Sequence, residues 1–151
     1  AIREAARRYA QVSIVGKDLL ITPEAAVDYA RQILAGLKHE SFHVIFLTAK
    51  NRVIGAETLS EGTVNRSAVH PRRIVESALS CGAAGFFLIH NHPSGDPKPS
   101  QDDIDLTRKL ARLTADLDLI LHDHLVVGRE GHFSMRERGL MQGPTTQRTK
   151  S

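Results

Sequence analysis

The hydrophobic pattern of the chain changes its period several times, and each change marks a predicted element. Apolar residues at helical spacing predict three helices, over residues 23–38, 71–82 and 101–117. Short apolar or alternating runs predict strands over residues 42–48, 53–59, 84–90, 119–127 and 132–135. Thr22 as an N-cap and Pro23 at the first helical position indicate where the first helix begins.

The order of these elements predicts the fold class. A tight turn at Lys50-Asn51 joins residues 42–48 to residues 53–59 as an antiparallel pair, while helices separate most of the other strands. This mixture predicts an α/β (α+β) protein with three layers. The length of 151 residues suits a single domain. We expect that domain over residues 21–140, with an N-terminal arm over 1–20, a hairpin or edge strand within 12–21, and a flexible tail over 141–151.

Composition and charge narrow the class of protein only slightly. The formal net charge is +3, and an isoelectric point of about 9.3 permits contact with nucleic acid without requiring it. No apolar run is long enough to span a membrane, so no membrane association is expected. The single cysteine, Cys81, cannot form an internal disulfide. We expect a small buried side chain at that position and a reducing, cytoplasmic location.

The strongest chemical signal is the segment His90-Asn91-His92-Pro93, which Asp103 follows at the start of the next predicted helix. Side chains alternate along a strand, so both imidazoles point to one face where strand 84–90 ends. Asp103 shares the inward face of its helix with Thr107 and Leu110. Two histidines and one carboxylate form the usual ligand set of a catalytic zinc that keeps one position open for water.

Structural roles for the same residues stay open. Ser100-x-x-Asp103 ahead of an apolar helix is also a capping pattern, and a histidine pair on a strand can be buried and hydrogen-bonded. A second His-x-His, His122-Asp123-His124, lies inside an apolar strand. For Asp123 or His124 we expect a role in orienting a metal ligand through its outer ring nitrogen. Four isolated histidines are expected on the surface or in loops: His39, His43, His70 and His132.

Glu57, His90-Asn91-His92-Pro93-Ser94-Gly95, Ser100 and Asp103 together resemble the metal motif of the JAMM family, also called JAB or MPN+. The continuation through Asp96-Pro97 and Pro99-Ser100 is similar to the bacterial RadC-like branch. Similarity extends over most of residues 20–140, through the stretches Lys50–Ile54, Glu61–Asn65, Val69–Arg72 and Asp123-His124. RadC-like proteins commonly carry an N-terminal helix-hairpin-helix segment. Residues 1–20 are too short for one, which disfavours a DNA-repair role.

The resemblance implies a curved mixed sheet flanked by helices, of the cytidine-deaminase-like JAB type, with zinc held by His90, His92 and Asp103 and a water completing the coordination. It also implies that Glu57 is the general base. In residues 53–59, alternation places Glu57 on one face with Val53, Gly55 and Leu59, and such apolar neighbours are expected to raise the pKa of the acid. The alternative for Glu57 is an exposed acid on an edge strand. Ser100 is expected to donate a hydrogen bond to the tetrahedral oxyanion.

These expectations favour a zinc-dependent hydrolase of the JAMM metallopeptidase type, acting on an amide or isopeptide bond of a protein or peptide substrate. Two other interpretations stay open. One is a nuclease-like, metal-dependent hydrolase of a phosphodiester or of another amide. The other is a DNA-associated repair or accessory module that keeps the metal for stability, although a purely structural zinc would more often have four protein ligands. The oligomeric state stays open as well.

Overall fold

The computed structural model describes residues 23–34, 36–61 and 69–142. The elements run in the order α2 (Pro23–Leu34), β1 (Ser41–Leu47), β2 (Val53–Glu61), α3 (Pro71–Ser80), β3 (Gly85–His92), α4 (Gln101–Ala115), β4 (Ile120–Gly128) and β5 (Gly131–Ser134). The predicted arm, the hairpin at 12–21, the Thr22 cap and most of the predicted tail lie outside the described residues. Within them, every predicted helix and strand is present, with small differences at its ends.

The strands form one sheet in the order β2-β1-β3-β4-β5. Strand β1 runs antiparallel to both of its neighbours, β2 and β3, and β5 runs antiparallel to β4. Only β3 and β4 are parallel, and helix α4 makes the crossover between them. The mixed sheet confirms the predicted α/β class.

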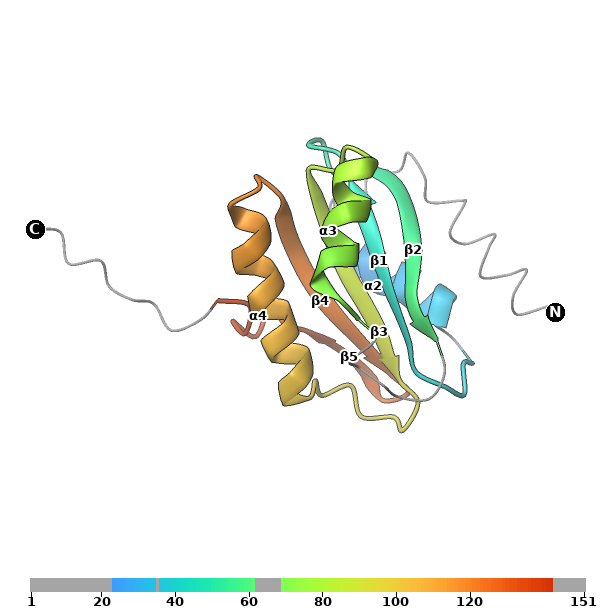
Figure 1. Cartoon of the computed structure of the whole chain (residues 1–151). Helices are drawn as coiled ribbons and strands as arrows, with labels where there is room; N and C mark the ends of the chain where they lie inside the picture. The colour runs from blue at the N-terminus through green and yellow to red at the C-terminus, as the bar shows by residue number, and fades with distance from the viewer. Residues whose placement is uncertain (1–22, 35, 62–68, 143–151) are drawn as a thin grey trace, which may run out of the picture.

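Helices cover both faces of the sheet, as Figure 1 shows, with α3 and α4 on the near face and α2 behind. On the α2 side, Ile33 and Leu34 pack against Ile45, Ile89 and other strand residues. On the other side, Ile74 of α3 and Leu110 of α4 pack against strand side chains that include Phe86 and Leu88. Strand β1 is buried along its whole length, as expected for a strand that is apolar on both faces.

Irregular pairing between β1 and β2 changes which residues share a face. The register shifts between Phe42 and His43 and again between Phe46 and Leu47. As a result Val53 packs in the core on the α2 side, whereas Leu59 packs on the α3 and α4 side. The expectation that Glu57 shares one face with both residues is therefore wrong, because simple alternation does not continue through a bulge.

Three smaller expectations also need correction. His43 is fully buried, because Ser41 and Thr58 bind its two ring nitrogens at 2.7 and 3.2 Å. Cys81 is exposed rather than buried, since it caps the C-terminal end of α3. Helix α2 ends at Leu34 rather than near residue 38.

Among the helices that the structure describes, none is long and apolar enough to cross a membrane.

Candidate metal centre

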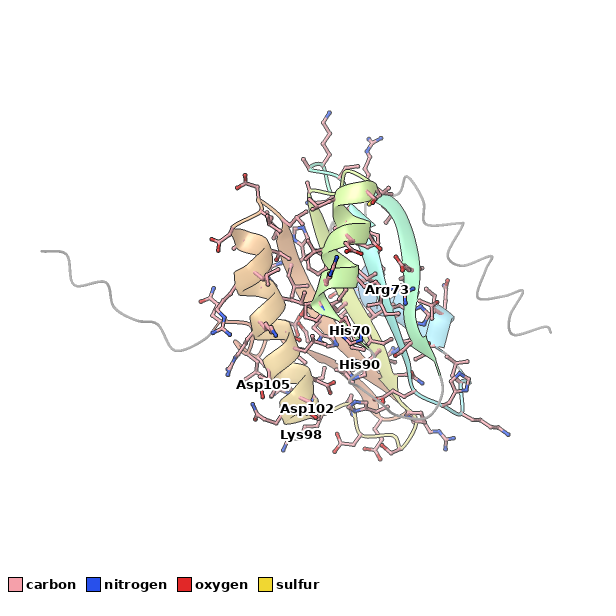
Figure 2. All side chains as sticks on the ribbon, viewed as in Figure 1. His70, Arg73, His90, Lys98, Asp102 and Asp105 are labelled. Atoms are coloured by element: carbon pink, nitrogen blue, oxygen red, sulfur yellow. The ribbon has the colours of Figure 1, made fainter. Side chains whose placement is uncertain are left out.

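The end of β3 and the first turn of α4 bring the three predicted ligands together. His90 Nε2 lies 2.9 Å from His92 Nε2, and Asp103 Oδ2 lies 3.4 and 3.7 Å from these two nitrogens. Figure 2 shows His90 in the region between the starts of α3 and α4, which His70 and Asp102 mark. Donor atoms around a tetrahedral zinc with bonds of about 2.0–2.1 Å stand about 3.3 Å apart. The observed spacing therefore fits one small ion.

Capping of α4 holds Asp103 in this position. Its carboxylate oxygen Oδ2 accepts a hydrogen bond from the Ser100 backbone N–H at 2.8 Å, and its own N–H donates to Ser100 Oγ at 3.1 Å. These two bonds form a complete capping box. The same Oδ2 faces both imidazoles, so one oxygen caps the helix and faces the candidate metal position. The two roles that the sequence left open are thus compatible in the structure.

A second carboxylate, that of Glu40, lies beside the imidazoles. Its Oε1 is 3.6 Å from His92 Nε2 and 4.0 Å from His90 Nε2. Glu40, His90 and His92 offer donor atoms that all lie within 4.8 Å of one another, which is close enough to hold a metal ion. Glu40 precedes the first residue of β1, and sequence reasoning missed it.

The Asn91 side chain holds the backbone around Glu40 against β3. Its side-chain oxygen accepts from the Ser41 N–H at 2.7 Å, and its side-chain nitrogen donates to the His39 carbonyl at 3.0 Å. These two groups flank Glu40 in the chain. Asn91 is buried, so both hydrogen bonds are protected from competition with water. The residue between the two histidines therefore positions the acid that faces them.

Glu57 lies elsewhere on the sheet. Its Oε1 accepts hydrogen bonds from Arg73 Nε at 3.0 Å and Nη2 at 2.9 Å. In the sheet, Glu57 lies opposite Val44, which in turn lies opposite Leu88 rather than His90. The structure therefore brings Glu40, and not Glu57, to the two imidazoles.

His124 of β4 binds the outer nitrogen of His90. His90 Nδ1 and His124 Nε2 are 2.7 Å apart, and His124 Nδ1 is 2.6 Å from Thr107 Oγ1. The Thr107 hydroxyl donates its proton to the Asp103 carbonyl at 2.7 Å. His90, Thr107 and His124 are all buried. We call this chain of hydrogen bonds, from His90 through His124 and Thr107 to Asp103, the imidazole relay.

The relay determines which ring nitrogens carry protons. Because the Thr107 hydroxyl proton is donated to a carbonyl, Oγ1 accepts from His124 Nδ1–H. His124 Nε2 is then the acceptor for His90 Nδ1–H, which leaves His90 Nε2 unprotonated and facing Asp103. His92 Nδ1 similarly lies 3.0 Å from the Asp96 carbonyl, which can only accept. Both Nε2 lone pairs then converge with a carboxylate, an arrangement that suits a cation.

The electrostatics of the site agree with this arrangement. Burial lowers the pKa of His90, which keeps this ring neutral. Burial also opposes charge on Asp103 and His92. The nearby imidazoles of His90 and His92 nevertheless hold the pKa of Asp103 well below its usual range, and the Asp103 carboxylate raises the pKa of His92. Phe42 stacks on His90 with ring centroids 5.2 Å apart. In the metal-free site the raised pKa of His92 favours a proton on this ring.

The other members of the second His-x-His do not face the site. The pairing of β3 with β4 has a register shift between Phe86 and Phe87. Phe86 pairs with Leu121 but Phe87 pairs with Asp123, so the pairing skips His122. This bulge turns His122 and Asp123 toward the α2 side, where both line a separate cavity of about 810 Å³. Asp123 accepts from the backbone N–H groups of His124 and Arg136 and from the Ser134 hydroxyl. It joins β4 to β5 and does not approach the imidazoles.

A three-layer α/β sheet with a His-x-His pair at a strand end and an aspartate opening the next helix defines a JAB-type domain. Residues 20–140 match the family model described as "RadC-like JAB domain". The chain belongs to this family, as the residue pattern led us to expect.

Similar proteins carry names that say nothing of activity. The chain is 46% identical over 124 residues to UPF0758 protein STH371 of Symbiobacterium thermophilum, covering 82% of this chain and 53% of that protein. It is 40% identical over 140 residues to a UPF0758 protein of Rhodobacter capsulatus, covering 93% and 65%. A Geobacillus relative, UPF0758 protein GWCH70_2550, is 38% identical over 136 residues, covering 90% and 60%. The chain thus spans between half and two thirds of the length of these relatives, so the shortness of residues 1–20 does not argue against a DNA-repair role of a longer protein.

Proposed function

We propose that this chain is a zinc-dependent hydrolase of the JAMM type that cleaves an amide or isopeptide bond in a protein or peptide. The observation that carries the proposal is the convergence of His90 Nε2, His92 Nε2 and Asp103 Oδ2 at 2.9–3.7 Å, with the Glu40 carboxylate beside them. Two neutral imidazoles and one carboxylate suit zinc and leave one coordination position open. The chemistry that zinc supplies in such a site is the acidification of a water molecule to a pKa of about 7.

Glu40 is the proposed general base in place of Glu57. The base must lie within reach of the water that attacks the carbonyl, and it must carry the proton to the leaving nitrogen. Glu40 Oε1 lies 3.6 Å from a proposed ligand atom, whereas the carboxylate of Glu57 is bound by Arg73. Asp103 is the better ligand of the two nearby carboxylates, because it is buried, ionised and held by the capping box.

Ser100 is proposed to donate its hydroxyl proton to the carbonyl oxygen as that oxygen gains negative charge. Capping uses a lone pair of Ser100 Oγ and not its proton, so the two roles do not exclude each other chemically. Removal of one such donor typically lowers the rate by about 10²–10³. His124 is proposed to orient His90, and Asp123 no longer has a part in the site. The exposed single thiol of Cys81 fits the reducing cytoplasm in which we propose that the protein acts.

The test compares Glu40→Gln with the matched variant Glu57→Gln. Each purified protein is assayed for zinc content and then for cleavage of peptide and isopeptide libraries. We expect Glu40→Gln to keep its zinc and to lose about 10²–10⁴ in rate, because a positioned base contributes that much. Glu57→Gln should keep both zinc and activity. Loss of activity in Glu57→Gln alone would return the base to Glu57.

The same assay decides between amide and phosphodiester chemistry. A zinc-loaded protein that cleaves single- or double-stranded oligonucleotides but no peptide bond would replace this proposal with the nuclease-like one. A protein that binds zinc but whose Glu40→Gln variant behaves like the wild type in every assay would favour the accessory-module interpretation. DNA contact itself is measurable as a steep fall of affinity with salt concentration.

A further inference from the structure

A second cleft, of about 470 Å³, borders the candidate metal centre. It lies between the end of α2 with the turn that follows it, the end of β3, and the end of β4. His92 is part of its wall, and the Nε2 atom of the same residue faces Asp103 and Glu40. The cleft and the candidate metal centre therefore share His92, at the end of β3.

Charge in this cleft is of one sign. Arg31, Lys38 and Arg129 line it, and no aspartate or glutamate does so among residues 23–34, 36–61 and 69–142. All three cations are exposed. In the described part of the chain none of them forms an ion pair with a carboxylate. Three cations that line one cleft, with no carboxylate partner among the described residues, favour an anion there.

The floor of the cleft is apolar. Leu34 and Val127 are buried core residues that also line the cleft, and Leu37 packs against the same core. Asn91 lines the cleft too, but its amide already bonds to Ser41 and His39. The cleft thus combines an apolar floor with a cationic rim. This combination matches a ligand that has an apolar body and one anionic group.

We propose that this cleft binds the carboxylate end of the substrate, as a C-terminal residue with an apolar side chain. The identity of the occupant rests on the proposed amide hydrolysis at the neighbouring metal centre. A phosphodiester backbone fits less well, because its phosphates would use the cations and leave the apolar floor without a partner. The carboxylate of a terminal apolar residue uses both parts of the cleft.

The test is an NMR titration of the full chain, as purified and again after chelator treatment, at constant ionic strength. The probes are N-acetyl-L-leucine, its uncharged amide and inorganic phosphate. We expect N-acetyl-L-leucine to shift the backbone signals of Gly36, Lys38 and Arg129 in both preparations, which excludes direct binding to zinc. The amide should bind at least about tenfold more weakly, because it lacks the charge.

Substitutions of single cations test which residues of the cleft bind N-acetyl-L-leucine. Lys38→Gln and Arg129→Gln should each weaken binding of N-acetyl-L-leucine by about threefold to fivefold, as expected for one exposed charge contact. Lys109→Gln is the matched control, because Lys109 is an exposed cation on α4, on the other side of the sheet. It should leave the affinity unchanged.

Three results would overturn the proposal: equal binding of the acid and its amide, tighter binding of phosphate than of N-acetyl-L-leucine at the same residues, or no effect of either cleft variant. Because the titration is repeated without metal, its failure is distinct from failure of the proposed hydrolysis. An active zinc hydrolase that does not bind the probe would leave the function intact and remove only the cleft assignment.

Discussion

Thr107→Val tests whether the imidazole relay prepares His90 to bind a metal. Valine has nearly the shape of threonine but no oxygen, so the change deletes the acceptor that lies 2.6 Å from His124 Nδ1. A buried N–H without a partner costs about 1–3 kcal/mol. His124 avoids this cost by moving its proton to Nε2, where it donates to His90 Nδ1. His90 must then carry its own proton on Nε2, the atom that faces the metal position.

The magnitude follows from this change of tautomer. To bind zinc, the variant must either restore the unfavourable tautomer of both rings or lose the bond between them. Loss of a group that orients a metal ligand typically weakens metal affinity by about 10–100-fold, which corresponds to about 1.4–2.7 kcal/mol. We expect the zinc Kd of Thr107→Val to rise by this factor. Competition with a chelating dye at fixed pH measures it.

Two controls separate the relay from ordinary helix packing. Thr107→Ser keeps the hydroxyl and should bind zinc nearly as the wild type does. Thr114 is also buried in α4 and donates to the carbonyl of Leu110 at 2.8 Å, but no imidazole contact is found for it in the described residues. Thr114→Val therefore removes the same kind of intrahelical bond and should leave zinc affinity unchanged.

Long-range ¹H–¹⁵N NMR of the metal-free protein observes the tautomers directly. The wild type should show His124 protonated on Nδ1, and Thr107→Val should show it protonated on Nε2. A valine variant that binds zinc within about twofold of the wild type, with His124 still protonated on Nδ1, would refute the relay as a positioning device.

Three further predictions follow from the same geometry. Asp103→Asn should weaken zinc binding by at least about 100-fold, measured by chelator competition. Asp103→Ala should in addition lower the free energy of unfolding by about 1 kcal/mol relative to Asp103→Asn, measured by urea unfolding. The reason is that the asparagine oxygen can still accept from the Ser100 N–H, whereas alanine has no acceptor. Zinc affinity should fall as pH drops from 8 to 6, because the pKa of His92 is raised and zinc must displace the proton on this ring. A flat profile of affinity against pH would contradict this. In the metal-free protein the same proton stabilises the fold below about pH 6.5, and this contribution is lost as pH rises through the raised pKa. Gly128→Ala should destabilise the protein by about 1–3 kcal/mol and weaken zinc binding, because a Cβ there would overlap the carbonyl group of Gly95 in the loop after His92; Gly55→Ala, whose Cβ would meet nothing within 4 Å, is its control.

The elements and the convergence of His90, His92 and Asp103 could be predicted because their signals are local. Hydrophobic period separates helix from strand without knowledge of neighbours. The inward position of Asp103 follows from its spacing to Thr107 and Leu110, and all three side chains are indeed buried on one face of α4. Likewise, His90 and His92 are two residues apart at the end of one strand, and their contact needs no information about the other strands.

The acid beside the triad could not be predicted in this way, because its place depends on the register of the sheet. Phe42 pairs with His90 across the antiparallel β1 and β3. Continuing that register by two residues puts Glu40 across from His92. The sequence indicates β1 and β2 as a hairpin, but it does not indicate that β3 lies on the other side of β1. Without that neighbour, the family resemblance and the apolar pattern of residues 53–59 both indicated Glu57.

The register between β3 and β4 determines which side chain of β4 bonds to His90 in the imidazole relay. One bulge in β4, opposite the step from Phe86 to Phe87, decides that His124 rather than Asp123 faces α4. A slip of one residue exchanges the two faces of a strand. It would bring the Asp123 carboxylate toward His90 Nδ1 and remove the neutral acceptor that His124 provides. His90 Nδ1–H would then donate to a buried carboxylate, a partner that also orients a metal-binding ring but makes the ring more basic than a neutral acceptor does. The bulge therefore gives His90 a neutral partner, so the hydrogen bonding of a proposed metal ligand on β3 depends on a backbone irregularity in the parallel neighbour of that strand.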